Sequence, residues 1–196
     1  MTLDEMVKLT GKRSETFEIM MKFLSEIENP LIVETGCMRE ENNFEGDGMS
    51  TLIFDTYCSE KGGELWSVDL DQKAVDFANS KVKVGNVVCS DSITFLRDKN
   101  KEFLKEGKKI DLLYLDSFDL DPDYAHPSSL HHILELTAIM PSLKEGTMVV
   151  VDDNIVEMIE EKKYKILGKG TYVAQYFQAI GVIPTFIGYQ WGWILK

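Results

Sequence analysis

The chain has 196 residues, of which 44% are hydrophobic and 28% charged. This length suits one domain, since domains usually run to roughly 100–200 residues, and the composition excludes a disordered or fibrous protein. The net charge of −12 opposes binding to duplex nucleic acid, so we expect a small-molecule substrate and no nucleic-acid partner. Two short basic clusters, 8–13 and 162–169, are interleaved with polar or apolar residues and are expected to be solvated surface.

The cysteines and the first residues of the chain bear on its compartment. Cys37, Cys58 and Cys89 are odd in number and lack the spacing of metal ligands, which argues for a reducing environment without disulfide bonds. The first residues include acidic Asp4 and Glu5 in place of a basic segment, and no apolar stretch reaches the ~18 residues that a membrane span needs. We therefore expect a soluble, cytoplasmic protein with no membrane partner.

The hydrophobic pattern predicts strands and helices in regular alternation. A first helix begins near Ser14, where apolar residues recur at three- and four-residue spacing, and ends at Asn29-Pro30. Leu31-Ile32-Val33 is short and apolar, as in a strand buried on both faces. Further strands are predicted at 64–68, 86–89, 110–115 and 147–151, and further helices at 48–60, 71–81, 92–106 and 128–141. Such alternation implies parallel strands with right-handed crossovers, which is a doubly wound α/β fold.

The end of the chain departs from this alternation. After a helix over 171–180, two predicted strands at 182–189 and 191–195 are joined too tightly for a helical crossover and are expected to pair antiparallel. We predict a single α/β domain over 1–196, with an N-terminal helical segment (1–30) and a core (31–196) of parallel strands that ends in this antiparallel hairpin. A polar insertion, Met38–Asp47, separates the first strand from its helix.

The first strand leads into residues suited to a cationic ligand. Ligands of an open parallel sheet bind beyond the carboxyl ends of its strands, and here Glu34 and Gly36 follow the first strand directly. Gly48 and Ser50 follow the insertion, where glycine permits close approach of a ligand and the helix start offers free amides. The Gly-x-Gly-x-x-Gly spacing of dinucleotide-binding loops is absent. An acid at Glu34 instead suits the sulfonium and ammonium groups of S-adenosylmethionine.

Two further strand ends carry residues suited to a nucleoside. Asp69 ends the second strand, where a carboxylate can accept both ribose hydroxyls. Asp91 and Ser92 follow the third strand in a small polar turn that would face the adenine. Each residue has a structural alternative, because Glu34 and Asp69 could serve as helix caps and the glycines as turn residues.

Taken in order, Val33-Glu34-Thr35-Gly36, Ser67-Val68-Asp69 and Ser90-Asp91-Ser92 resemble the first three motifs of class I S-adenosylmethionine-dependent methyltransferases, over residues 31–195. The resemblance implies a Rossmann-like sheet and an enzyme that uses this cofactor. The sequence departs from the family's compact Gly-x-Gly, because the insertion separates Gly36 from the later glycines. The candidate cofactor-binding residues are Glu34, Gly36, Gly48, Ser50, Asp69, Asp91, Ser92 and Asp116.

Acids also end the fourth and fifth strands, as Asp116 and as Asp152-Asp153-Asn154. Oxygen ligands converging there would suit Mg²⁺ or Mn²⁺, and such a cation would lower the pKa of a substrate hydroxyl. The pattern resembles metal-dependent small-molecule O-methyltransferases of the catechol type and the macrocin and cephalosporin-hydroxylase group. This resemblance implies Asp116, Asp153 and Asn154 as metal ligands, with Asp152 as a substitute ligand. The catechol-type lysine that follows the strand-four aspartate is missing, and in the metal-free alternative Asp116 only orients the substrate.

All three histidines follow the fourth strand. His126, in a loop above the sheet, has the freest access to a substrate and is the candidate general base. The helical wheel of the next segment places the other two histidines on the surface. The face that it predicts to be buried consists of Leu130, Ile133, Leu134 and Ala138.

The sequence therefore predicts methyl transfer from S-adenosylmethionine to a small-molecule hydroxyl, assisted by Mg²⁺ or Mn²⁺, with Asp116 and His126 as catalytic residues. Two rivals stay open: metal-free N- or O-methylation, and a non-catalytic Rossmann-like module that binds S-adenosylmethionine or a nucleotide. By analogy with other short methyltransferases, the hairpin edge is also a candidate homodimer contact.

Overall fold

The computed structural model of the chain describes residues 1–46, 49–160 and 163–196. Its centre is a six-stranded sheet in the order β3-β2-β1-β4-β5-β8. The strands are β1 (Leu31–Thr35), β2 (Glu64–Asp69), β3 (Asn86–Cys89), β4 (Leu112–Leu115), β5 (Met148–Val151) and β8 (Trp191–Ile194). The first five are parallel and β8 runs antiparallel to β5. This arrangement confirms the doubly wound α/β fold.

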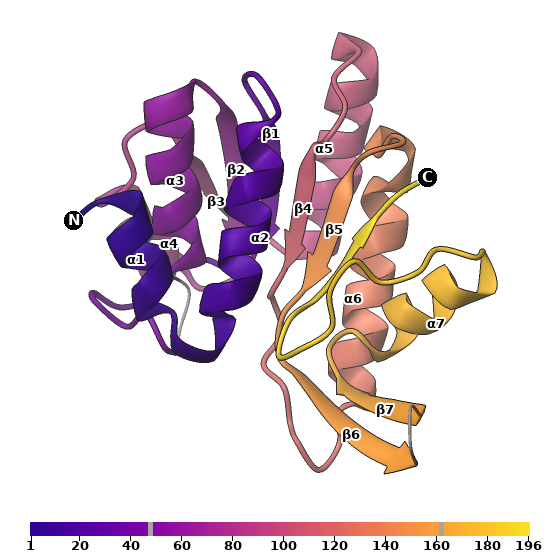
Figure 1. Cartoon of the computed structure of the whole chain (residues 1–196). Coiled ribbons are helices and arrows are strands. Elements are labelled where there is room, and N and C mark those ends of the chain that lie inside the picture. The colour runs from indigo at the N-terminus through magenta and orange to yellow at the C-terminus, as the bar shows by residue number, and fades with distance from the viewer. Residues whose placement is uncertain (47–48, 161–162) are drawn as a thin grey trace.

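Helices cover both faces of the sheet (Figure 1). One face carries α1 (Leu3–Leu9), α2 (Ser14–Ser25), α3 (Ser50–Lys61) and α4 (Gln72–Asn79), and the other carries α5 (Ser92–Glu106), α6 (His126–Ile139) and α7 (Thr171–Ala179). Two short 3₁₀ helices, η1 (Gly11–Arg13) and η2 (Met140–Ser142), complete the helical elements of the described chain. None of the helices in these described ranges is long and apolar enough to cross a membrane.

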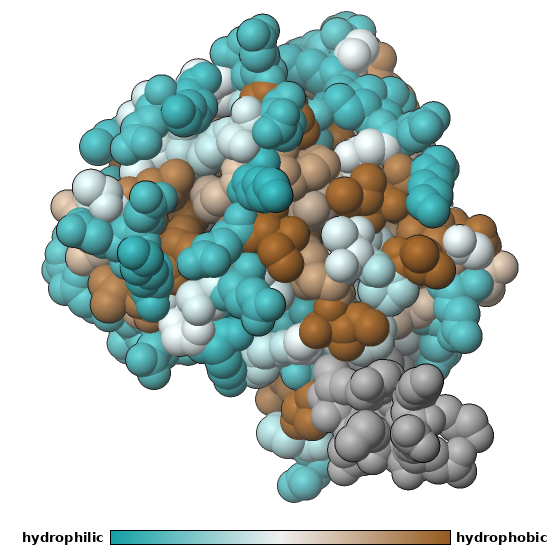
Figure 2. Space-filling model, viewed as in Figure 1, coloured by the Kyte–Doolittle hydropathy of each residue, from teal (hydrophilic) through white to brown (hydrophobic). Residues whose placement is uncertain are grey.

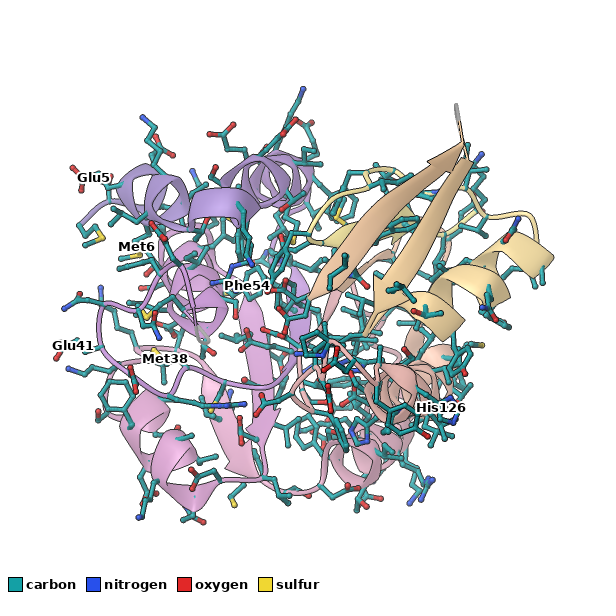
Figure 3. All side chains as sticks on the ribbon, turned by 90° about the horizontal axis from the view of Figure 1, so that it is seen from below. Glu5, Met6, Met38, Glu41, Phe54 and His126 are labelled. Atoms are coloured by element: carbon teal, nitrogen blue, oxygen red, sulfur yellow. The ribbon has the colours of Figure 1, made fainter. Side chains whose placement is uncertain are left out.

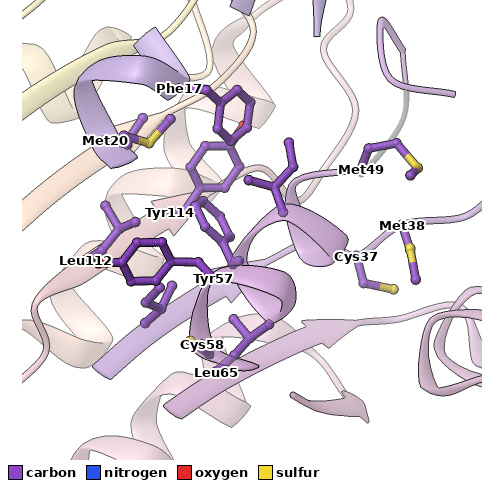
Figure 4. Close-up of a cluster of buried hydrophobic side chains, with 14 of the residues drawn as sticks. Phe17, Met20, Cys37, Met38, Met49, Tyr57, Cys58, Leu65, Leu112 and Tyr114 are labelled. Carbon is purple, nitrogen blue, oxygen red and sulfur yellow. The ribbon is translucent and has the colours of Figure 1, made fainter. Parts of the chain in front are cut away.

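Each central strand contributes to two hydrophobic cores, because successive side chains of a strand point to opposite faces of the sheet. In β4, Tyr114 belongs to the core under α1–α4, while Leu113 belongs to the core under α5–α7. The ring centroid of Tyr114 lies 6.0 Å from that of Phe17 in α2 and 5.3 Å from that of Phe54 in α3. Figure 4 shows Phe17 and Tyr114 next to each other in this core. Such burial on both faces explains why the strands read as unbroken apolar runs.

The predicted C-terminal hairpin is only half correct. β8 pairs antiparallel with β5 as predicted, but 182–189 forms no strand and contributes a single bridge, between Phe186 and Gly192. Pro184 has no backbone N–H to donate to a ladder, and Gly188 favours a turn over an extended strand. β8 is therefore an edge strand of the sheet.

A second hairpin, which the sequence analysis did not predict, follows β5. β6 (Asn154–Glu160) and β7 (Lys163–Gly168) pair antiparallel with each other and are separate from the main sheet. In Figure 1 this hairpin projects from the carboxyl edge of the sheet, beside the loop between β4 and α6. The many Glu and Lys residues of this segment interrupt the alternation of apolar and polar residues that would indicate a strand. The sequence therefore suggests solvated surface.

The buried face of α6 also differs from the prediction. Leu130 and Leu134 are 43% and 45% exposed, whereas His132 and Glu135 are fully buried. The helix turns these polar residues inward because Glu135 accepts hydrogen bonds at the carboxyl edge of the sheet, from Ser117 and from Thr35 of β1. A helical wheel locates the buried face from apolar side chains alone. It therefore cannot predict that Glu135 is buried, because that burial depends on hydrogen-bond donors on other elements.

Exposed hydrophobic side chains lie near β8, after α7. Ile180, Ile183 and Ile187 are 55%, 68% and 48% exposed. Figure 2 shows hydrophobic residues interrupting the hydrophilic surface on the half of the molecule that holds β8 and α7. The predicted homodimer contact falls in this region and stays a prediction.

Candidate active site

Gly36 lets the loops after β1 and β4 approach each other closely. Its φ is +80°, and a Cβ at this position would lie 2.6 Å from the backbone oxygen of Asp116. The Gly36 N–H donates to the carbonyl of Val68 at the end of β2, over 2.8 Å. Any side chain here would be strained and would force the ends of β1 and β4 apart, so glycine is a structural requirement at the centre of the site.

Glu34 in β1 is completely buried. Its Oε2 accepts hydrogen bonds from the hydroxyls of Thr51 and Ser67, each over 2.7 Å, while Oε1 has no partner among the described residues. Burial raises the pKa of Glu34 to about 7, against the opposing effect of hydrogen bonds from Ser50, Ser67 and Thr51. A buried carboxylate with an unpartnered oxygen, directly before the Gly36 loop, has the chemistry to receive a cationic group.

Asp69 ties the loop after β1 to the end of β2. Its Oδ2 accepts the N–H of Cys37 over 3.2 Å, and its Oδ1 accepts the N–H of Asp71 over 2.9 Å. The cap of α4 is Asp71, whose side chain accepts the N–H of Lys73. Asp69 is therefore not the helix cap considered as its alternative role, and its carboxylate borders an open pocket.

A pocket at the carboxyl ends of β2, β3 and β4 brings Asp69, Asp91 and Ser92 together. Its cavity volume is about 190 Å³, below the roughly 300–1,000 Å³ of typical small-molecule sites, so it can enclose only part of such a ligand. Asp91 Oδ1 accepts the N–H of Thr94 over 2.8 Å and so caps α5, and this hydrogen bond lowers the pKa of Asp91. The full lining is Arg39, Val68, Asp69, Leu70, Ser90, Asp91, Ser92, Ser117, Phe118, Asp119 and His131.

Leu70, Phe118 and His131 also line this pocket and are not among the residues predicted from the sequence. Leu70 and Phe118 are 76% and 50% exposed, and both line the pocket. Phe118 has a positive φ of 48°, and its ring centroid lies 5.3 Å from that of His131. The apolar residue directly after Asp69 was a usable signal, whereas the position of Phe118 depends on the loop after β4.

A polar network from α6 supports the end of this pocket that holds Asp91 and Ser92. His131 Nε2 lies 2.8 Å from Ser92 Oγ and 3.3 Å from the buried carboxylate of Glu135. Burial opposes charge on His131, but the hydrogen bond and negative charge of Glu135 outweigh it and raise the pKa of His131. His132 is fully buried, and this desolvation lowers its pKa to about 4. Neither histidine is therefore the ordinary surface residue that the sequence suggests.

The acids at the ends of β4 and β5, Asp116, Asp152 and Asp153, are here called the strand-end carboxylates. Lys169, which is only 1% exposed, lies between two of them: its Nζ is 2.8 Å from Asp116 Oδ1 and 2.8 Å from Asp153 Oδ2. Burial opposes the charge on Lys169, but the two carboxylates raise its pKa so that it stays protonated. The same burial raises the pKa of Asp116. Lys169 belongs to the basic cluster 162–169, so the prediction that this cluster is solvated surface is wrong at Lys169.

The third carboxylate, Asp152, is paired with Arg13. Arg13 is 2% exposed, and its Nη1 lies 3.1 Å from Asp152 Oδ2. The same oxygen accepts hydrogen bonds from the Tyr114 hydroxyl and from Gln190 Nε2. Arg13 also donates to the carbonyl of Phe44, and so joins η1 to the insertion and to the end of β5. The prediction of solvated surface for 8–13 is therefore wrong at Arg13, because a buried carboxylate requires this charge.

The predicted metal ligands lie together, but their atoms are engaged with the protein itself. One oxygen each of Asp116 and Asp153 contacts Lys169, and Asp152 Oδ2 contacts Arg13. Asn154 Oδ1 accepts the N–H of Gly170 over 2.8 Å. Within the described residues, no group of three or more His, Cys, Asp or Glu side chains is arranged to hold a metal ion. The side chains as placed do not fit a divalent cation.

His126 lies at the exposed N-terminus of α6, and among the described residues it hydrogen-bonds to Tyr172 and not to a strand-end carboxylate. Its Nδ1 is 2.6 Å from the hydroxyl of Tyr172 in α7, and its ring contacts Tyr124. In Figure 3, His126 lies on the same side of the molecule as the β6–β7 hairpin, whereas Met38 and Glu41 of the insertion lie on the other side. The structure thus places His126 near a second helix end, and its catalytic role stays a prediction.

The described part of the insertion packs on the N-terminal helices. Met38 and Phe44 are buried in the core under α1–α4, and Arg39 Nη2 lies 3.1 Å from Asp119 Oδ1 in the loop after β4. The insertion and that loop therefore meet above the sheet. Ser50, at the start of α3, is buried beside Glu34, and its role in the predicted cofactor loop stays a prediction. Gly48, also predicted for this loop, lies outside the described residues.

Comparison with known proteins gives matches in structure only. No protein-family model matches the sequence, and no curated protein matches it. Among solved structures, MycE, a methyltransferase of the mycinamycin biosynthetic pathway in complex with Mg and SAH, superposes with a TM-score of 0.59 at 11% identity, over 95% of this chain and 54% of MycE. A protein named as a ribosomal RNA methyltransferase from Plasmodium falciparum has a TM-score of 0.55 at 15% identity, over 95% of this chain and 96% of its own. DesVI from Streptomyces venezuelae has a TM-score of 0.54 at 11% identity, over 96% and 92%.

The chain has the Rossmann-like methyltransferase fold. At these identities the likeness shows the fold alone. The chain spans about half the length of MycE, with 54% of that protein covered. The fold places the pocket of Asp69, Asp91 and Ser92 at the carboxyl ends of the strands, where open α/β sheets bind their ligands.

Proposed function

We propose that the chain is an S-adenosylmethionine-dependent methyltransferase that acts on a hydroxyl group of a small molecule. The observation that carries the proposal is the pocket at the ends of β2 and β3, which joins Asp69, Asp91 and Ser92 beside the Gly36 loop. Two sequence motifs that are separate along the chain thus line one pocket, and the loop after β1 meets it through the hydrogen bond from Cys37 to Asp69.

The residues present fit the cofactor at both of its ends. The carboxylate of Glu34, buried directly before the Gly36 loop, would favour the positive charge of the methionine portion through its negative charge, and the Asp69 carboxylate would accept the ribose hydroxyls. Asp91 and Ser92 would border the adenine edge, with the exposed side chains of Leu70 and Phe118 against its faces. Bound S-adenosylmethionine supplies a methyl group that the sulfonium already activates, so the protein has mainly to align the acceptor with it.

Asp116 is the group best placed to act on the acceptor. Its backbone oxygen is the atom that approaches Gly36, and its Oδ1 is held by Lys169. Its other carboxylate oxygen receives no hydrogen bond from a described residue, and the side chain is 15% exposed. This free oxygen can accept the proton of a hydroxyl that attacks the methyl group. Because the chain carries a net charge of −12, we favour a small acceptor over a nucleic acid.

Metal assistance is the part of the sequence hypothesis that the side chains support least. A metal that bridges β4 and β5 would need oxygens that Lys169 and Arg13 occupy. We therefore propose that transfer to the hydroxyl proceeds without a divalent cation. Turnover unchanged after dialysis against EDTA is the expected result, and loss of turnover that Mg²⁺ restores would instead support the metal.

Titration calorimetry tests the cofactor proposal directly. We expect S-adenosylmethionine to bind with micromolar affinity, and NAD and a nucleotide sugar to give no heat. Asp69→Ala should weaken S-adenosylmethionine binding by roughly 10–100-fold, because two charge-assisted hydrogen bonds to the ribose are lost. Asp98→Ala is the matched control, since Asp98 is exposed on α5 and pairs only with Lys101.

Three results would separate the alternatives. No heat with S-adenosylmethionine would refute the cofactor assignment. Equal loss in Asp69→Ala and Asp98→Ala would place the cofactor elsewhere. Binding without methyl transfer to any hydroxyl compound in a broad acceptor panel would favour the non-catalytic binding module.

A further inference from the structure

Lys169 is almost completely buried, although lysine side chains are usually exposed. It stands between Gly168 and Gly170, immediately before α7. A Cβ at Gly168 would lie 2.7 Å from the Cα of Asn154, and a Cβ at Gly170 would lie 2.8 Å from Asn154 Oδ1. Gly168 must therefore be glycine for the backbone to come this close to the end of β5, while a side chain at Gly170 would displace the side chain of Asn154.

Hydrogen bonds fix the backbone around Lys169 on three sides. The carbonyl of Gly168 accepts the hydroxyl of Ser129 in α6 over 2.5 Å, and the N–H of Lys169 donates to the carbonyl of Asp153 over 3.2 Å. The N–H of Gly170 donates to Asn154 Oδ1 over 2.8 Å. Asn154, which the sequence suggests as a metal ligand, thus holds the backbone that carries Lys169.

The ammonium of Lys169 is saturated by strand-end oxygens. Its Nζ lies 2.8 Å from Asp116 Oδ1, 2.8 Å from Asp153 Oδ2 and 3.3 Å from the backbone oxygen of Asp116. An ammonium has three protons, and each has an acceptor here. The side chain is 2% exposed, so moving the ammonium into solvent would leave the carboxylates of Asp116 and Asp153 without this cation.

We propose that Lys169 is the resident cation of this site and takes the place of a divalent metal between the ends of β4 and β5. Resting on the proposed function, the inference assigns Lys169 as a positioning residue: it holds one oxygen of Asp116 and leaves the other to the acceptor. Lys169 acts through Asp116 and does not itself touch the acceptor. Removing the ammonium while leaving its space empty should then create a metal site from the same oxygens.

Manganese uptake, followed by the electron paramagnetic resonance signal of free Mn²⁺, tests this inference without any need for activity. The wild-type chain should take up no more Mn²⁺ than Lys169→Met, in which the methionine fills the lysine's space without a charge. Lys169→Ala leaves both the space and the uncompensated carboxylates, and should take up about one further Mn²⁺ per chain. At Mn²⁺ about a hundredfold above its Kd, the melting temperature of Lys169→Ala should rise by roughly 5 °C or more.

Two results would overturn the inference. One is uptake of a Mn²⁺ by the wild-type chain in excess of Lys169→Met, since a metal would then displace or accompany the lysine. The other is uptake by Lys169→Ala no greater than by Lys169→Met. Should Lys169→Ala fail to fold, the comparison of wild type with Lys169→Met still decides. A melting temperature that Mn²⁺ raises in the wild type but not in Lys169→Met would then count against the inference.

The outcome is separable from that of the proposed function. Failure of the wild-type chain to bind S-adenosylmethionine would refute the methyltransferase proposal and would leave the manganese result unaffected. Binding of S-adenosylmethionine together with Mn²⁺ uptake by the wild type would refute the lysine inference alone.

Discussion

At the scale of single residues, the site depends on charges whose partners lie far away in the chain. Glu34 is the exception, because it is buried with hydrogen bonds but no cation among its partners. Its raised pKa means that the folded chain binds a proton at Glu34 that the unfolded chain releases near pH 4.5. Stability from this group is therefore complete below about pH 4.5 and is lost as the pH rises through about 7, by up to about 3 kcal/mol.

The variant Glu34→Gln separates the destabilising effect of the buried charge from the role of the carboxylate in cofactor binding. At pH 8.5 we expect the variant to melt at a higher temperature than the wild type, because no buried charge forms, and the difference should shrink towards pH 6. The same variant should bind S-adenosylmethionine more weakly at pH 8.5, and wild-type affinity should fall as the pH decreases through about 7. Melting curves and calorimetry in matched buffers measure both, with exposed Glu60→Gln as the control. A stability difference that does not depend on pH would contradict this role of Glu34.

At the scale of elements, a buried acid joins α3 to the turn that precedes β3. Asp55 is 1% exposed, and its carboxylate accepts the N–H groups of Lys83, Val84 and Gly85 over 2.7–2.9 Å. This turn lies at the opposite end of β3 from the pocket of Asp69 and Asp91. Asp55 is therefore expected to set the stability of the α3–β3 packing and not the chemistry of the site.

Asp55→Asn replaces one acceptor oxygen by an amide that must face backbone N–H groups. We expect a loss of roughly 2–3 kcal/mol in the free energy of unfolding, which corresponds to a fall of about 5–10 °C in melting temperature. The affinity for S-adenosylmethionine, measured well below the melting temperature, should stay within about twofold of wild type. Exposed Asp76→Asn on α4 is the control. A variant as stable as wild type, or one that loses cofactor affinity while folded, would show that Asp55 has another role.

At the scale of the whole molecule, the sheet separates two cores and the surface carries a large negative charge. Arg13 of η1 and Lys169 of the segment before α7 are both buried against the acids at the ends of β4 and β5. These two buried cations compensate the strand-end carboxylates but leave the net charge at −12. Mutual repulsion of the surface acids then destabilises the compact state.

Screening should relieve this repulsion. We expect the melting temperature to rise by a few degrees between 10 mM and 200 mM NaCl, since the Debye length falls from about 30 Å to below 10 Å. Replacing the exposed acids Asp121 and Asp123 by lysine changes the net charge by four units, from −12 to −8, and should reduce the effect of salt. A melting temperature that is constant or falls with salt would show that surface repulsion does not limit stability.

The sequence by itself determined the alternation of strands and helices and the acids at the strand ends, because both depend on local patterns. Apolar runs followed directly by Glu34, Asp69 and Asp91 are visible in the chain, and the parallel sheet then brings their ends to one edge. The β6–β7 hairpin was missed because its charged residues resemble solvated surface, and the buried polar face of α6 because its partners lie on other elements.

Only the tertiary structure decided what the strand-end carboxylates bind. Arg13 precedes Asp152 by 139 residues, and Lys169 follows Asp116 by 53. No local pattern distinguishes these two cations from their exposed neighbours in the same basic clusters. Their burial follows from the packing of η1 and of the Gly168–Gly170 segment against the end of β5, where an uncompensated carboxylate would be costly. The amino-acid pattern alone therefore suggests a metal, whereas the folded chain supplies its own cations.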